Sequence, residues 1–372
     1  MVKILQKQIQ KVRQASSASE LYQPLQDAID LEHSTIPPYL TAFYSIKSGF
    51  NQEIAALILS IVRQEMLHMT IAANVLNAIG GQPVINEPNF IPHYPGNLPG
   101  NVEPDLVVGL APLSLSVVKN IFMRIEQPEN PQEFPKEYIP ISCDLAEQEA
   151  QFNFMLRTQE EYNTIGEFYQ AIIDKIHLLG PDIFIGKPER QVVNEQWFAP
   201  NLLFAVTNPE EATRALMIIA EQGEGVGTSP LDSQGELAHY YKFSEIFQGY
   251  HLYQKAPFEF VYNTAQPIPL DPTGIYNLVE NSKANMYVPG TMARRMVDQF
   301  NYSYTSLLNG LHKTFNGEPN YLNTVMGLMF DLKLQAQKMA ETILTPEDLS
   351  SPKAWDNVDK SLAPSFEYAS ND

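Results

Sequence analysis

Two copies of the pattern Glu-x-x-His constrain this chain more than any other feature of its sequence. Glu65 and His68 form the first copy, and Glu236 and His239 form the second, which opens an apolar stripe at helical spacing that continues to Tyr250. Chance placement of the glutamates and histidines would give about half a match in a chain of this composition. A Glu and a His three residues apart share one face of an α-helix and can reach the same metal ion. The sequence therefore predicts helices that meet around a metal.

The first pair lies within an apolar helical stripe. Ile61, Glu65, His68 and Ala72 follow one another at intervals of 4, 3 and 4 residues, which places them on one side of a helix. Glu32 occupies a comparable stripe on the preceding helical stretch. A carboxylate that faces a protein core costs several kcal/mol unless it is paired or bound to a cation. These glutamates are therefore candidate metal ligands.

A di-metal carboxylate bundle also takes one glutamate from each of two further helices. Glu32 fills one of these places, and a glutamate of the helical stretch 145–179 should fill the other. Ideal helical phasing puts Glu161 on the apolar face of that stretch and Glu167 about 120° away. Gly166, beside Glu167, leaves room for a cofactor. Periodicity alone favours Glu161, and both glutamates stay candidates.

Prolines and glycines divide the chain into helical stretches and long loops. Pro37 and Pro38 should kink the first long helix, because proline lacks the amide hydrogen and clashes with the preceding turn. Glu126 ends a short helix and is expected on the surface rather than beside a ligand. Periodicity predicts two long helices within 21–80 that join near 49–51, a loop over 82–112, and helices over 113–126, 145–179, 209–221, 235–253, 291–315 and 318–344.

The composition excludes several classes of partner. With 24 Lys and Arg against 43 Asp and Glu, the formal charge is −19, which repels phosphate backbones and anionic lipid. The single cysteine, Cys143, supplies neither an intramolecular disulfide nor a thiolate metal cage. No apolar run approaches the ~20 residues of a bilayer span. We expect a cytoplasmic protein without nucleic-acid or membrane partners.

Several short stretches resemble the ferritin-like domain family, which includes the ferritin-like domain of the violacein enzyme VioB, an iminophenyl-pyruvate dimer synthase. The similar stretches are 30–39 (DLEHSTIPPY), 65–68 (EMLH), 164–169 (TIGEFY), 221–225 (EQGEG) and 239–243 (HYYKF), within about 21–253. The resemblance implies a four-helix bundle with a carboxylate–histidine di-metal site, with two Fe ions expected and Mn as an alternative. Position by position it implies the ligands Glu32, Glu65, His68, Glu167, Glu221 and His239.

The resemblance thus favours Glu167 over Glu161 and Glu221 over Glu236. Both Glu221 and Glu236 stay candidates, because the glycine-rich insert at 223–227 leaves the helical register between them undetermined.

The fold expected from these observations is mainly α, a ferritin-like four-helix bundle with long loops and a C-terminal helical subdomain. We place the bundle at 18–255, the subdomain at 256–350 and a tail at 351–372. The expected function is a non-haem di-iron or di-manganese oxidoreductase acting on a small organic substrate, similar to the iminophenyl-pyruvate dimer synthase domain. Carboxylate and imidazole ligands suit these metals. The alternatives are an iron-binding or iron-detoxifying protein and a metal-stabilised interaction module, and a homodimer is an open option.

Overall fold

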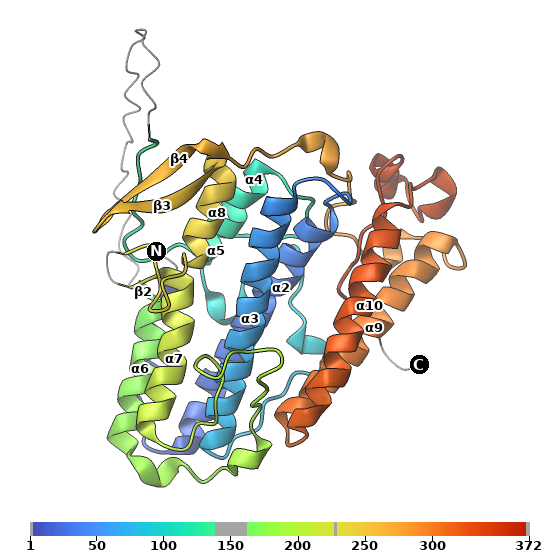
Figure 1. Cartoon of the computed structure of the whole chain (residues 1–372). Helices are drawn as coiled ribbons and strands as arrows, with labels where there is room; N and C mark the ends of the chain where they lie inside the picture. Colours follow the sequence, from blue (N-terminus) through green and yellow to red (C-terminus); the bar gives the residue numbers. More distant parts are fainter. Residues whose placement is uncertain (1–2, 138–161, 227–228, 370–372) are drawn as a thin grey trace.

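The computed structural model describes residues 3–137, 162–226 and 229–369, and it confirms a mainly α-helical architecture (Figure 1). The helices are α1 (Gln6–Gln14), α2 (Tyr22–Tyr44), α3 (Gln52–Ala78), α4 (Leu115–Val117), α5 (Met123–Ile125), α6 (Ile165–Leu179), α7 (Pro209–Glu224), α8 (His239–Gln248), α9 (Met292–Phe315) and α10 (Leu322–Ala340). The strands are β1 (Lys3–Leu5), β2 (Tyr162–Thr164), β3 (Tyr250–Ala256) and β4 (Glu259–Pro267), which form the antiparallel pairs β1–β2 and β3–β4.

The long helices α2 and α3 form the centre of the molecule, and α6 and α7 pack beside them (Figure 1). Helix α8 lies beyond the end of α7, and both helices pack against α3. The short helices α4 and α5 lie next to α8. Helices α6 and α7 therefore flank the continuous pair α2–α3 along one half of its length. The helices α4, α5 and α8 flank it along the other half.

Helix α2 continues through the proline pair to Tyr44. The nitrogen of Pro38 cannot donate to the carbonyl of Ser34, four residues earlier. The hydroxyl of Tyr94, from the loop after α3, donates to this carbonyl at 2.8 Å instead. A side chain of the long loop thus supplies one of the hydrogen bonds that the prolines remove.

Helix α3 lies in the core of this bundle. Among the described residues it is the one helix that has the length and apolar content to cross a membrane. Of its most apolar 18-residue window, 56% is buried inside the protein. Its apolar character is therefore explained by packing against α2, α7 and α8.

The third long helix is shorter than the sequence suggests. Residues 162–164 form β2, in which Thr164 pairs with Lys3 of β1, and helix α6 begins only at Ile165. The side chain of Thr164 caps this helix by accepting from the amide of Glu167 at 2.9 Å. The expectation of a helix through 162–164 is therefore wrong, and 145–161, with the candidate Glu161, lies outside the described residues, as does Cys143.

The helix predicted over 235–253 is also shorter at both ends. A turn precedes it, in which the carboxylate of Asp232 accepts from the amide of Glu236 at 2.9 Å, and the helix starts at His239. Gly249 ends it in a left-handed conformation with φ of 74°, which glycine adopts at little cost. Residues 250–256 then form β3 rather than helix.

The C-terminal helices α9 and α10 form an antiparallel pair beside α2 and α3 (Figure 1). Their contact with the bundle includes a hydrogen bond of 2.6 Å between Nε2 of His33 and the hydroxyl of Tyr304. The side-chain amide of Asn77 on α3 also donates to the backbone carbonyl of Phe315 at 2.6 Å. The boundaries expected after residues 255 and 350 stay predictions, and strand β3 runs across the first of them.

Candidate metal centre

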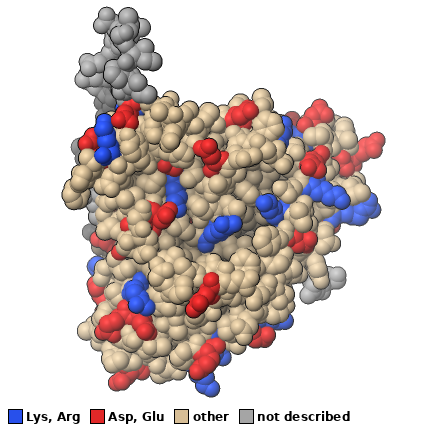
Figure 2. All heavy atoms as spheres, viewed as in Figure 1, with Lys and Arg blue, Asp and Glu red and all other residues tan. Residues whose placement is uncertain are grey.

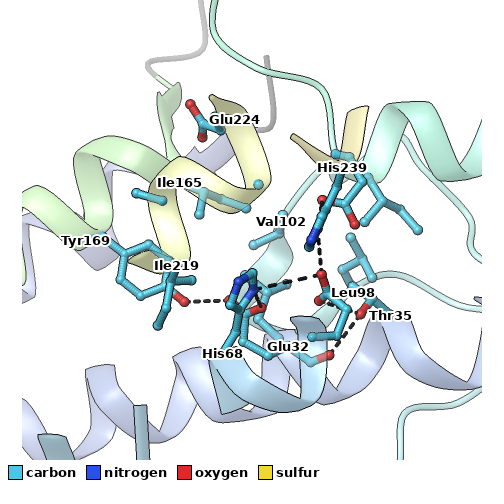
Figure 3. Close-up of a pocket in the computed structure, with 16 residues that line it drawn as sticks. Glu32, Thr35, His68, Leu98, Val102, Ile165, Tyr169, Ile219, Glu224 and His239 are labelled. Atoms are coloured by element: carbon cyan, nitrogen blue, oxygen red, sulfur yellow. Dashed lines mark hydrogen bonds and ion pairs between the residues drawn. The ribbon is translucent and has the colours of Figure 1, made fainter. Parts of the chain in front are cut away.

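Five acidic and histidine side chains converge in the core of the bundle (Figure 3). Each of these residues is 8% exposed or less, so all five polar side chains are shielded from bulk water. They come from four places in the chain: Glu32 on α2, Glu65 and His68 on α3, Glu126 directly after α5, and His239 at the start of α8. The structure thus brings together both histidines and two of the glutamates that the sequence singles out, and it adds Glu126.

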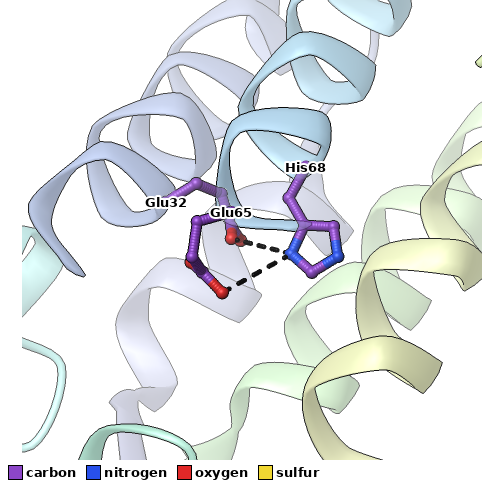
Figure 4. Close-up of side chains that lie close together, drawn as sticks. All are labelled: Glu32, Glu65 and His68. Atoms are coloured by element: carbon purple, nitrogen blue, oxygen red, sulfur yellow. Dashed lines mark hydrogen bonds and ion pairs between the residues drawn. The ribbon is translucent and has the colours of Figure 1, made fainter. Parts of the chain in front are cut away.

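The first group of possible ligands consists of Glu32, Glu65 and His68 (Figure 4). The Nδ1 atom of His68 lies 3.3 Å from Oε2 of Glu32 and 3.9 Å from Oε1 of Glu65. Glu65 and His68 point the same way because they are three residues apart on α3. Their donor atoms lie within 4.8 Å of one another, which is close enough to share one cation.

The second group consists of Glu65, Glu126 and His239. The Nδ1 atom of His239 lies 2.8 Å from Oε1 of Glu65 and 3.4 Å from Oε2 of Glu126. The rings of His68 and His239 lie nearly parallel, with their centroids 5.4 Å apart. Glu65 therefore belongs to both groups, and the two histidines flank it.

His239 provides a test of whether a cation fits here. Both of its ring nitrogens are buried and have no hydrogen-bond partner, because the close contact with Glu65 lacks hydrogen-bond geometry. Buried polar atoms in proteins are nearly always hydrogen-bonded. An unpaired imidazole beside the carboxylates of Glu65 and Glu126 is the donor set that a divalent cation would satisfy.

His68 is oriented by α7. Its Nε2 atom lies 2.9 Å from Oε1 of Gln222, an oxygen that accepts only, so Nε2 carries the hydrogen and donates it. Loss of the proton on Nδ1, as metal binding would require, leaves the lone pair on the atom that faces Glu32 and Glu65. A histidine whose other nitrogen is fixed in this way is typical of metal sites.

The three carboxylates are held by hydroxyl groups of the surrounding helices. In each case the hydroxyl donates to the oxygen that points away from the histidines, and the second oxygen faces the centre. The bonds are Tyr169 to Oε1 of Glu32 at 2.6 Å, Thr35 to Oε2 of Glu65 at 2.8 Å, and Tyr39 to Oε1 of Glu126 at 2.5 Å. The inward oxygens are therefore fixed in place beside the histidines, where a cation could bind them.

Negative charge is concentrated in this space. Burial raises the pKa of Glu65 well above its ordinary value, and the neighbouring carboxylates of Glu126 and Glu32 raise it further. Burial also acts to raise the pKa of Glu32, but the hydrogen bond and charge of His68, together with the hydroxyl of Tyr169, outweigh it, and the pKa is lowered. A cation among these groups would relieve the repulsion that raises the pKa of Glu65.

A small cavity of about 60 Å³ opens at the centre of the five residues (Figure 3). This volume holds little more than ions and a few water molecules. Glu224 also lines this cavity, and its carboxylate accepts from the amide of Gly166 at 3.2 Å. The apolar walls are formed by Leu31, Leu98, Val102, Ile125, Ile165 and Ile219.

The other predicted ligands lie elsewhere. The side chain of Glu167 is exposed and accepts from the amide of Thr164, which it helps to cap. Glu221 is half-buried on α7 and does not line the cavity. Glu236 is exposed in the turn before α8, so it does not share a helical face with His239. The expectation that these three glutamates join the cluster is corrected by their positions.

Glu126 and Gln222 are the residues that sequence reasoning missed. A π-helical turn, Val118–Phe122, lies just before Glu126, and such turns often occur at functional sites. This turn and the contact with Tyr39 bring the carboxylate inward, against the expected surface position. Gln222 directly follows the predicted candidate Glu221 on α7. The residue that faces the site is therefore one position further along the helix than the sequence suggested.

Comparison with known proteins gives a family, a distant relative and a solved structure of similar fold. The sequence model of the family described as Ferritin-like matches residues 25–248. Dichlorochromopyrrolate synthase of Lentzea aerocolonigenes is 23% identical over 346 residues, which cover 82% of this chain and 32% of the relative, so the chain spans about a third of that protein. The crystal structure of a ferritin-like protein from Caulobacter vibrioides matches with a TM-score of 0.54 and 24% identity, over 86% of this chain and 95% of that one. This likeness supports the fold.

Proposed function

The chain belongs to the ferritin-like family, and from that premise we propose that the buried cluster is the di-metal centre of a non-haem oxidoreductase acting on a small organic substrate. The observation that carries this proposal is the sharing of Glu65 by two groups of possible ligands. A carboxylate common to two such groups is the arrangement of di-iron and di-manganese carboxylate bundles.

The residues divide naturally between two ions. Glu32 and His68 would hold one ion, Glu126 and His239 the other, and Glu65 would contact both. Carboxylate oxygens and imidazole nitrogens suit iron or manganese. When bound, a pair of such ions supplies the electron-transfer chemistry needed to activate O₂ or peroxide.

The chain itself supplies orientation and exclusion of water. The hydroxyls of Tyr169, Thr35 and Tyr39 hold the carboxylates in fixed positions, and Gln222 keeps the hydrogen of His68 on Nε2. The apolar walls keep bulk water from the centre, which strengthens every electrostatic interaction inside it.

An organic substrate is supported by one relative and by the resemblance of the sequence rather than by the cavity. The relative from Lentzea aerocolonigenes is named as a synthase of dichlorochromopyrrolate. The resemblance to the iminophenyl-pyruvate dimer synthase domain favours the same type of role, and that closer kinship stays a proposal.

A second function is favoured by the size of the cavity. A volume of about 60 Å³ leaves little space for an organic molecule beside two ions. Oxidation or binding of iron, with no organic substrate, needs no more room than this.

Metal content and oxygen uptake test the proposal. We expect about two Fe or Mn per chain by elemental analysis after anaerobic loading, strong loss in Glu65→Gln, and no loss in the control Glu236→Gln, which changes an exposed glutamate. Protein that stays metal-free after loading with Fe(II) would overturn the di-metal proposal.

The two functions differ in their use of oxygen. Oxygen uptake that continues after the added Fe(II) is consumed, and that depends on a small organic compound, supports the oxidoreductase. Uptake that always stops with the Fe(II) supports iron oxidation alone.

A further inference from the structure

A second cavity lies away from the metal centre, where the end of α2, the start of α3 and helix α10 meet. Its volume is about 280 Å³, and none of its lining residues belongs to the metal centre. Figure 2 shows the face on which α3 and α10 approach each other, with lysine or arginine side chains near its middle. The residues important here are Phe43, Tyr44, Lys47, Phe50, Lys333 and Gln337.

The charge of this cavity is opposite to that of the protein. Lys47 and Lys333 are the charged residues among the described residues that line it, and no carboxylate does so. Neither lysine forms an ion pair within the described part of the chain: Lys47 donates to the carbonyl of Thr273 at 2.8 Å, and Lys333 lies over the ring of Phe43 at 5.4 Å. The carboxylate of Asp271 lies close enough to Lys47 to interact with its charge, but Asp271 does not line the cavity. In a chain of net charge −19, two ammonium groups at a cavity lined by no described carboxylate favour an anionic ligand.

The remaining walls are aromatic and apolar. Phe43 and Tyr44 come from the last turn of α2, and Phe50 from the loop before α3. Phe50 is 42% exposed, which leaves part of a large apolar ring open to a ligand. Cavities of this composition, apolar with a few convergent polar groups, are typical of sites for small molecules.

We propose that this cavity binds a small aromatic carboxylate. The ring of the ligand would pack against Phe43 and Phe50, and its carboxylate would pair with the ammonium groups of Lys47 and Lys333. Because Lys333 belongs to α10 and the other groups to the α2–α3 corner, such a ligand would also link the C-terminal helices to the bundle. The proposal does not depend on the metal centre.

Titration calorimetry with the full chain tests this proposal using two probes of nearly the same shape. The probes are 1-naphthaleneacetate, an anion, and 1-naphthaleneacetamide, its uncharged amide. We expect the anion to bind about tenfold more tightly, as a charge-assisted contact would give, and this preference to shrink as NaCl is added. Equal affinities for the two probes, or no binding of either at millimolar concentration, would overturn the proposal.

Variants separate the contribution of charge from that of shape. Lys333→Gln should weaken binding of the anion about fivefold or more and leave that of the amide unchanged. Its matched control is Lys338→Gln, which removes a lysine of the same helix that does not line the cavity. Ala56→Phe, which fills the cavity from α3, should abolish binding of both probes. If Lys338→Gln weakens binding as much as Lys333→Gln, or if Ala56→Phe leaves binding unchanged, the probes bind elsewhere. Circular dichroism checks that each variant is folded.

Discussion

The Nδ1 atom of His239 lies 2.8 Å from Oε1 of Glu65, yet neither nitrogen of this buried ring has a hydrogen-bond partner. The same carboxylate oxygen lies 3.9 Å from Nδ1 of His68. Glu65 is thus the residue on which both histidines converge, and its removal should affect the whole cluster rather than one half of it.

The stability of the metal-free protein should depend on pH through Glu65. Burial and the carboxylates of Glu126 and Glu32 raise the pKa of Glu65 well above its ordinary 4.5, so the folded chain holds a proton that the unfolded chain releases. The stability from this group is present at low pH and is lost as the pH rises above 4.5. We expect Glu65→Gln without metal to melt about 2 °C or more above the native chain at pH 8, with a smaller difference at pH 5. A difference that does not change with pH would contradict this assignment.

Metal stoichiometry should distinguish a shared ligand from one that belongs to a single group. Glu65 lies in both groups and Glu126 in one. Glu65→Gln should therefore lose both ions, whereas Glu126→Gln should retain about one ion per chain. Elemental analysis after identical loading and desalting measures this. Equal loss in the two variants would argue against the division of ligands between two ions.

Much of the site could be predicted from helical periodicity alone. Glu32, Glu65 and His68 lie on long helices whose apolar stripes extend on both sides of them, so the direction of each side chain follows from its place in the stripe. The same reasoning placed His239 correctly among the inward residues. It failed for Glu236, because Gly235 and the hydrogen bonds of Asp232 make a turn there and delay the helix to His239.

The positions of Glu167 and Glu126 also differ from those expected from the sequence, and each difference has its own physical cause. Thr164-x-x-Glu167 is a capping-box pattern, and the structure uses Glu167 in that way, so this signal was present in the sequence. The inward position of Glu126 depends on a π-helical turn and on Tyr39 of a distant helix. Spacing along the chain contains no information about either of these features.

Tyr169 should contribute to metal affinity although it does not belong to either group of ligands. Its hydroxyl donates to Oε1 of Glu32 at 2.6 Å and leaves Oε2 facing His68. Tyr169→Phe should weaken metal binding by about 10–100-fold, the effect usual for partners that orient a ligand. Competition with a chelator of known affinity measures it. Tyr22→Phe is the matched control, because it removes a tyrosine hydrogen bond to the carbonyl of Ile79, far from the centre; an equal effect there would point to a general loss of stability.

Tyr94 should stabilise the proline-containing part of α2. Tyr94 is only 3% exposed, and its hydroxyl donates to the carbonyl of Ser34. The nitrogen of Pro38 cannot donate to this carbonyl, because proline has no amide hydrogen. Tyr94→Phe leaves this buried carbonyl unpaired, which should lower the free energy of unfolding by about 1–3 kcal/mol. Urea denaturation of the metal-free chain measures the loss, with Tyr302→Phe on the exposed side of α9 as the control. Because Ser34 lies two residues from Glu32, Tyr94→Phe should also weaken metal binding, whereas full stability in this variant would show that another group satisfies the carbonyl.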